Sequence, residues 1–89
     1  MRAIVTVVGK DTVGIFAKVS SFIAEHNVNI DGVSQTVLKD TFCMIMSVDV
    51  SNCTVSFGEF AESIKVAGEK DGLAIHAMHE DIFNSMHRI

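Results

Sequence analysis

Proline, tryptophan and tyrosine are absent from this chain of 89 residues. Low-complexity segments, charged tails and long linkers are missing as well, and these usually mark boundaries between domains. We therefore predict one domain over residues 1–89. Hydrophobic residues make up 48% of the chain and charged residues 20%, a globular composition that leaves apolar surface for contact with a second subunit.

Positive charge is also scarce, because 7 Lys and Arg face 11 Asp and Glu, for a net charge of −4. A protein that neutralises nucleic-acid phosphates is normally basic, so we expect no nucleic-acid partner. No apolar run approaches the ~18–20 residues that span a bilayer. The first residues lack the apolar core and cleavage site of a signal peptide, so we expect a cytoplasmic protein without membrane contact.

Few residues are available to bind a metal. The two cysteines, Cys43 and Cys53, fit no metal-ligand spacing, and we expect both to be reduced. His76, His79 and His87 crowd the C-terminal region, but their spacing is not a recognised ligand set. We predict surface or capping histidines, no metal and no cofactor. A metal shared between subunits, with His79 and His87 as ligands, stays open as an alternative.

Hydrophobic periodicity predicts a strand, a helix, two strands, a helix, a strand and a short tail helix. Their approximate ranges are 2–8, 15–25, 28–38, 42–50, 57–70, 73–78 and 81–89. The first strand is almost wholly apolar, as a central strand is, whereas polar residues interrupt the second, as in a half-buried edge strand. Ser56 and Glu59 form a capping box at the start of the second helix.

This order of elements predicts an α+β, ferredoxin-like fold. Two right-handed strand–helix–strand units interleave into a four-stranded antiparallel sheet, with both longer helices on one face. The spatial strand order is then 4-1-3-2. The apolar first strand falls in the middle and the polar second strand at an edge, in agreement with their patterns.

The segment "GKDTVG", residues 9–14, forms the turn between the first strand and the first helix. We expect Asp11 or Thr12 to cap the helix, while Gly14 leaves backbone exposed in its first turn. Free N–H groups at a helix start attract a carboxylate, and the Asp11 carboxylate attracts an amine, so the turn suits a small zwitterion. Asp and Gly are common in any strand-to-helix turn, however, so the turn alone does not show whether a ligand binds there.

A longer stretch, residues 9–36, resembles the opening of an ACT domain. The family pattern is a D-x-x-G-[IV] turn, a helix with spaced apolar residues and a polar-N-[IV] strand start. The matching residues are Asp11, Gly14, Ile15, Val19, Ile23, Asn27, Asn29 and Ile30. The closing "HEDIFNSMHRI" resembles the tail of small stand-alone cytoplasmic ACT proteins ending in HEDIF-x-x-MHRI, which are similar to ACT units of glycine cleavage repressors and formyltetrahydrofolate deformylase.

The resemblance implies a regulatory module rather than an enzyme. ACT domains often pair side by side through the edge strand and first helix, and bind amino acids or related metabolites in the seam. The ligand-binding residues carried over are Asp11, Thr12, Val13, Gly14 and Ile15 from the turn, and Asn29, Ile30 and Asp31 from the edge strand. The ligand carboxylate would face the helix start, and its amine would face Asp11 or edge-strand carbonyls. Many family members have proline where Val13 stands, which makes this turn less rigid.

The function implied is that of a homodimer or larger oligomer that senses an amino acid-like metabolite and acts in trans on a partner protein. A ligand-free interaction module and a metal-stabilised oligomer are the alternatives. Acylphosphatases share the topology but need an arginine at the head of the first helix, where this chain has only Lys10. RNA-recognition modules stack bases on aromatic residues of two central strands, and here only Phe42 is available.

The tail carries an apolar stripe that must be buried. Its residues recur at i, i+1, i+4 and i+7, and they are Ile82, Phe83, Met86 and Ile89. The stripe can cover its own sheet or pack on a partner subunit. We expect the partner subunit, because the two longer helices already cover one face of a short chain's sheet.

Overall fold

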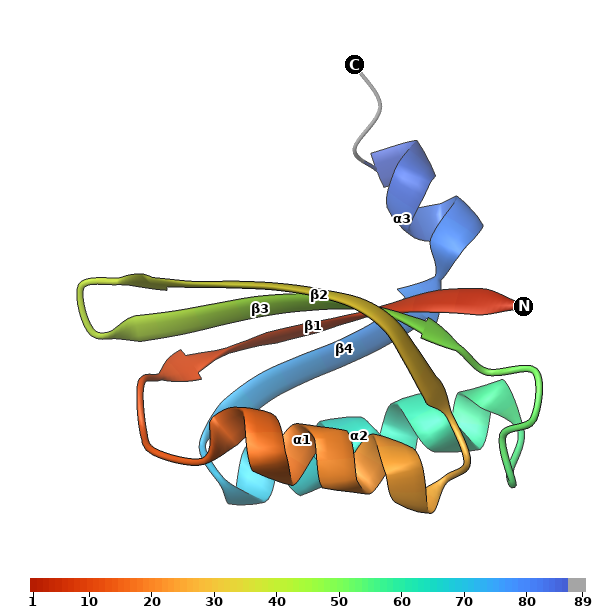
Figure 1. Ribbon diagram of the computed structural model, residues 1–89, viewed down its shortest axis with the longest axis horizontal. Coiled ribbons are helices and arrows are strands. Elements are labelled where there is room, and N and C mark those ends of the chain that lie inside the picture. Colours follow the sequence, from red (N-terminus) through yellow and green to blue (C-terminus); the bar gives the residue numbers. More distant parts are fainter. Residues whose placement is uncertain (87–89) are drawn as a thin grey trace.

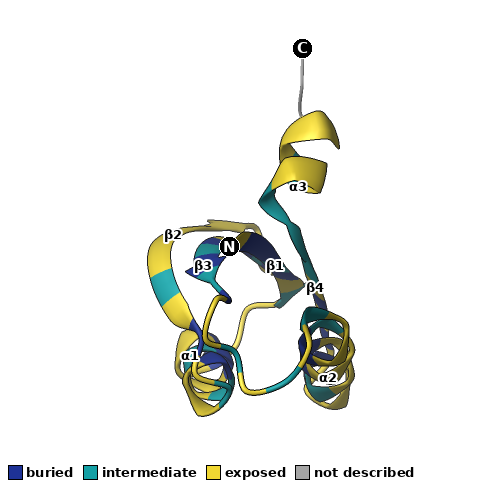
Figure 2. Ribbon diagram, turned by 90° about the vertical axis from the view of Figure 1, so that its right-hand side faces the viewer, coloured by how far each residue is buried: buried dark blue, intermediate teal, exposed yellow. Residues whose placement is uncertain are grey.

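The computed structural model describes residues 1–86. Its elements are β1 (Arg2–Lys10), α1 (Ile15–Glu25), β2 (Asn29–Leu38), β3 (Thr41–Asp49), α2 (Phe57–Lys70), β4 (Leu73–His79) and α3 (Glu80–Met86). The strands form one antiparallel sheet in the order β2-β3-β1-β4 (Figure 1). Helices α1 and α2 cover one face, and α3 rises from the opposite side (Figure 2). The predicted ferredoxin-like fold and strand order are confirmed.

The core lies between the sheet and the two longer helices. Side chains alternate along each strand, so every second residue faces the helices. The buried strand residues include Ala3, Val5, Val7, Phe42, Met44, Met46, Val48, Leu73 and Ile75, and the buried apolar side chains of the helices include Ile15, Val19, Ile23, Phe60 and Ile64. The predicted two-faced alternation of β3 is confirmed, with Cys43 and Ile45 on the opposite face.

The start of α2 confirms the cap by Ser56, which is one half of the predicted capping box. The Ser56 hydroxyl oxygen accepts a hydrogen bond from the backbone N–H of Glu59 at 3.2 Å. A cap of this kind stabilises a helix by about 1 kcal/mol. With 14 residues, α2 is longer than α1 and α3, and within residues 1–86 no helix has the length and apolar character needed to cross a membrane.

The edge strand β2 is more exposed than the sequence predicts. Ile30 is partly buried and the other nine residues of the strand are exposed, so the prediction of a half-buried strand is wrong for most of its length. The reason is visible in Figure 1, where the tip of the β2–β3 hairpin, at the left, extends past the start of α1. The exposed residues of β2 include Val33, Val37 and Leu38.

Gly68 tests the close packing of α2 on β4. A Cβ at this position would lie 2.6 Å from Cγ1 of Ile75 and 3.1 Å from the Leu73 carbonyl oxygen. We expect Gly68→Ala to lower the free energy of unfolding by about 1–2 kcal/mol, because overpacking outweighs the gain in helix propensity. Gly58→Ala, in the same helix with nothing within 4 Å, is the matched control and is expected not to destabilise. Urea denaturation measures both, and equal losses would contradict the close packing.

Candidate functional site

The predicted ligand-binding residues fall into two groups at opposite ends of α1. Residues 11–15 precede the helix and run into its first residue, whereas residues 29–31 follow its end. The helix has 11 residues and is therefore about 16 Å long. One copy of the chain does not bring the two groups together.

The first group is a turn fixed to the far end of the sheet. The backbone N–H of Asp11 donates to the carbonyl oxygen of Asp40, in the turn between β2 and β3, at 2.8 Å. The side chain of Ile15 is buried in the core, so Ile15 can offer a ligand only its backbone. Asp11, Thr12 and Val13 are exposed, and Val13 is fully so. The turn therefore presents a carboxylate, a hydroxyl and an apolar tip to the surroundings.

The predicted cap of α1 by Asp11 or Thr12 is wrong. The N-cap is Gly14, in the left-handed region at φ 87°, and within residues 1–86 no side chain caps the helix. Because Gly14 occupies the position immediately before Ile15, Asp11 and Thr12 lie too early in the chain to cap it. The first intrahelical bond runs from the N–H of Lys18 to the Gly14 carbonyl oxygen, at 3.0 Å. The preceding N–H groups of the first turn thus lack an intrahelical partner.

The second group lies at a bulge in β2. The pairing with β3 shifts register between Ile30 and Gly32, which leaves Asp31 as the extra residue. One carboxylate oxygen of Asp31 accepts from the Asn29 amide at 3.1 Å, and the other lies 3.2 Å from Nε of Arg2. Asp31 is thus engaged within the chain and holds the bulge and Asn29 in place.

A shallow groove runs between α1 and the start of β2. It has a volume of about 430 Å³, and its lining residues are Ser20, Ser21, Ala24, Val28, Asn29 and Ile30. Two of the predicted residues, Asn29 and Ile30, border it. The serines and the alanine were not predicted, although small residues grouped on the outer face of an amphipathic helix are a signal for close approach. Small side chains here permit close approach of another chain or a ligand.

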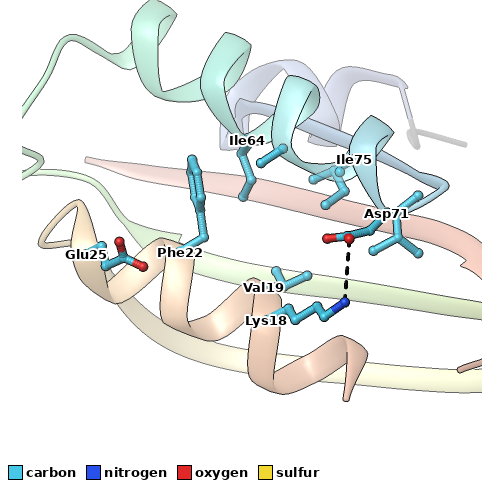
Figure 3. Close-up of a pocket in the computed structure, with 10 residues that line it drawn as sticks. Lys18, Val19, Phe22, Glu25, Ile64, Asp71 and Ile75 are labelled. Carbon is cyan, nitrogen blue, oxygen red and sulfur yellow. Dashed lines mark hydrogen bonds and ion pairs between the residues drawn. The ribbon is translucent and has the colours of Figure 1, made fainter. Parts of the chain in front are cut away.

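A second cavity, of about 200 Å³, lies between α1 and α2 (Figure 3). Buried core side chains, among them Val19, Ile64 and Ile75, form its floor. Lys18 and Asp71 approach each other to 3.5 Å across one end. The two side chains are 63% and 43% exposed, and ion pairs this accessible to water contribute little to stability. None of the predicted ligand-binding residues lines this cavity.

Within residues 1–86, the histidine and cysteine side chains do not gather at one site. The ring of His79 packs against Phe57, with ring centroids 4.3 Å apart. His87 lies outside the described residues, so the shared metal site stays a prediction. Across residues 1–86, no group of three or more His, Cys, Asp or Glu side chains is placed to hold a metal ion. Cys43 and Cys53 are not bonded to each other.

Among the described groups, one pKa departs clearly from its ordinary value, that of Asp49 at the end of β3. Hydrogen bonds from Ser51, together with the N-terminal ammonium 3.6 Å away, hold the pKa of Asp49 below its usual value. A lowered pKa stabilises the fold above the ordinary pKa of an aspartate, and this stabilisation is lost as the pH falls through the lowered value. Asp49 lies at the end of β3, where it pairs with Arg2 of β1 on one side and with Asn29 of β2 on the other.

The first turn and the groove beside β2 present backbone groups, small side chains and the Asp11 carboxylate to the surroundings. The sequence pattern of the ACT domain matches residues 2–77. The chain therefore belongs to the ACT domain family, whose members are regulatory ligand-binding modules. The family resemblance expected from the first turn and first helix is confirmed.

Relatives of similar length support this assignment. A UPF0237 protein of Methanopyrus kandleri is 50% identical over 99% of this chain and 98% of its own. The solved structure of an ACT domain protein from Streptococcus pneumoniae is 40% identical, with a TM-score of 0.82 and coverage of 98% of both chains.

Larger proteins contain the same fold as a part. A formyltetrahydrofolate deformylase from Pseudomonas putida has a TM-score of 0.79 at 12% identity, over 91% of this chain and 30% of that one. A structure assigned as a glycine cleavage system transcriptional repressor has a TM-score of 0.70 at 20% identity, over 85% of this chain and 43% of that one. These two likenesses show the fold alone, and they confirm the predicted structural similarity.

Gly14 gives a test of the helix start. Its φ of 87° is unfavourable for an L-residue with a Cβ, and nothing lies within 4 Å of the place that an added Cβ would occupy, so strain is the main cost of substitution. We expect Gly14→Ala to lower the free energy of unfolding by about 1–2 kcal/mol. Gly14→Asn should lose less, because Asn tolerates this region better. Gly32→Ala, equally open but without a positive φ, is the control. Equal losses for Gly14→Ala and Gly32→Ala in urea denaturation would contradict the left-handed start.

Proposed function

We propose that the chain is a non-catalytic regulatory module, with residues 1–89 forming one ACT domain. It binds an amino acid or related metabolite at a seam between two copies and acts in trans on a partner protein in the cytoplasm. Membership of a family of regulatory ligand-binding modules supports the general role. The position of the two groups of predicted ligand-binding residues supports the seam.

The separation of these two groups within one copy carries the proposal. The hydrogen bond between Asp11 and Asp40 ties the first turn to the far end of β2, while Asn29 stands at its start. Two copies related by a twofold axis and paired through β2 have antiparallel edge strands. The turn of one copy then lies beside Asn29 of the other, so a complete site forms only in the pair.

The ends of this composite site differ in charge, as a zwitterion requires. The uncapped start of α1 attracts the ligand carboxylate through N–H groups and the helix dipole. The exposed Asp11 carboxylate of the same turn attracts the amine. Across the seam, Asn29 and Ile30 close the site, while Asp31 acts by holding the bulge.

The same pairing covers apolar side chains that one copy leaves in water. Val33 and Val37 project from β2 on the helix side, at positions paired with the buried Met46 and Phe42, yet both are exposed. The small residues that line the groove along α1 permit the helices of two copies to approach each other.

Thermal denaturation against the twenty amino acids tests ligand binding. A ligand at 100 times its dissociation constant stabilises the folded state by about 2.7 kcal/mol, which raises the midpoint of a domain of this size by about 10 °C or more. We expect one amino acid or a close group to do so. Asp11→Ala should abolish the shift, whereas Glu62→Ala, at an exposed carboxylate on α2, should retain it. If no amino acid shifts the midpoint, amino acid sensing is refuted, and the seam is better explained as a docking surface for a protein.

Val37→Lys tests whether the site requires two copies. A lysine at an edge strand opposes pairing of that edge. We expect the mass in solution to halve and the ligand-induced shift to disappear together. Val66→Lys, at an exposed valine on α2, should change neither. Retention of the full ligand shift by a Val37→Lys protein of reduced mass would place the whole site within one copy.

A further inference from the structure

The sheet face opposite α1 and α2 is uncharged across its centre. Residues of this face alternate with the core residues, and strand pairing aligns them across the sheet. Acidic and basic side chains lie only at its ends, with Arg2, Asp49 and the bulged Asp31 at one end and Lys10 at the other. Between these ends the four strands carry apolar, hydroxyl, glycine and other neutral residues, together with a single histidine, His76.

Only one end of this face is covered by the chain itself. Helix α3 packs against β1 and β4, and Ile4 on this face is 7% exposed. Val8, four residues further along β1 and therefore about 13 Å away, is 44% exposed, and Ile45 on β3 is 45% exposed. A face without charges that still leaves valine and isoleucine in water is typical of an interface.

Helix α3 itself carries unburied apolar side chains. It rises away from the sheet on the open side (Figure 2), with Ile82 51% and Met86 63% exposed. Its seven residues span about 10 Å, which equals the separation of two sheets packed face to face. A helix of this length can bridge from its own sheet to a second sheet packed above it.

We infer that a second copy of this chain packs back to back on the open face, with the two α3 helices exchanged. The twofold axis lies between the two sheets and runs perpendicular to their strands. The strands of the partner therefore point in the opposite direction. The partner's α3 then stands over the uncovered end of β1, where Val8 and its neighbour Ala74 lie. Each copy supplies both the exposed helix and the uncovered face, so one symmetric contact buries all of them.

The available area is sufficient for such a contact. Four strands about 4.8 Å apart, over about five residues each, give a sheet face of roughly 300 Å² per copy. Two such faces and two bridging helices bury on the order of 1,000 Å², the lower limit for a specific assembly. Because the centre lacks charged side chains, closing the contact requires no desolvation of ions.

Reciprocal charge substitutions test the exchange. In sedimentation equilibrium of the full chain, Val8→Lys and Met86→Glu should each halve the mass relative to the unmodified protein. Val66→Glu, at an exposed valine on the other side of the molecule, should keep it. Mixing the Val8→Lys and Met86→Glu proteins in equal amounts should restore the mass, because the introduced lysine of one copy then meets the introduced glutamate of the other. Both sites are exposed, and circular dichroism checks that both variants fold.

Two results would overturn the inference. If Val8→Lys and Met86→Glu leave the mass unchanged, the open face is not an interface between copies. If each halves the mass but the mixture does not restore it, the helices are not exchanged. The β2 edge is a different surface, so the result is distinguishable from that of Val37→Lys. Loss of the back-to-back contact should leave any ligand-induced thermal shift intact.

Discussion

Two amphipathic helices cover one face of a four-stranded sheet, and the remaining properties of the domain depend on how far that cover extends. Beneath α1 and α2, β1 and β3 bury an unbroken series of alternate side chains such as Val5 and Met46, which are fully inaccessible. Beyond the helices, the β2–β3 hairpin runs on without cover, and the opposite face has only α3 above it (Figure 1). The chain is too short to cover its whole sheet, and both unfinished surfaces are places where another molecule can add stability.

The helix start and the edge strand are connected through the backbone. The bond from Asp11 to Asp40 joins the turn before α1 to the turn after β2, so the two cannot move independently without breaking it. Asp31 makes a similar connection at the other end of β2, where it links Asn29 to Arg2 of the central strand. The open edge is therefore held at both ends by polar contacts, while its middle presents apolar side chains.

Much of the fold could be predicted from the sequence, because its cues are local and agree with one another. The apolar run of β1, the alternation of β3 and the Ser56 cap each report on a few neighbouring residues. The start of α1 could not be predicted in the same way. Asp11 and Thr12 are both residue types that favour the N-cap position. The helix instead begins after Gly14, whose left-handed backbone places it at the N-cap without a side-chain hydrogen bond. The exposure of β2 depends on how much of the strand α1 covers in space, which periodicity within β2 does not report. The distance between Asp11 and Asn29 is likewise a property of the folded chain. In the sequence both residues belong to one continuous motif, which does not show that α1 holds them apart.

The uncovered strand β2 also carries a hazard. It contains no proline, and its bulge lies near its start, so most of the strand offers unpaired N–H and C=O groups to any extended chain that approaches. Exposed valines at Val33 and Val37 add an apolar strip beside those groups. An edge of this kind is a template for uncontrolled strand addition and aggregation. Occupation of the edge by a defined partner therefore protects the solubility of the protein as well as completing its structure.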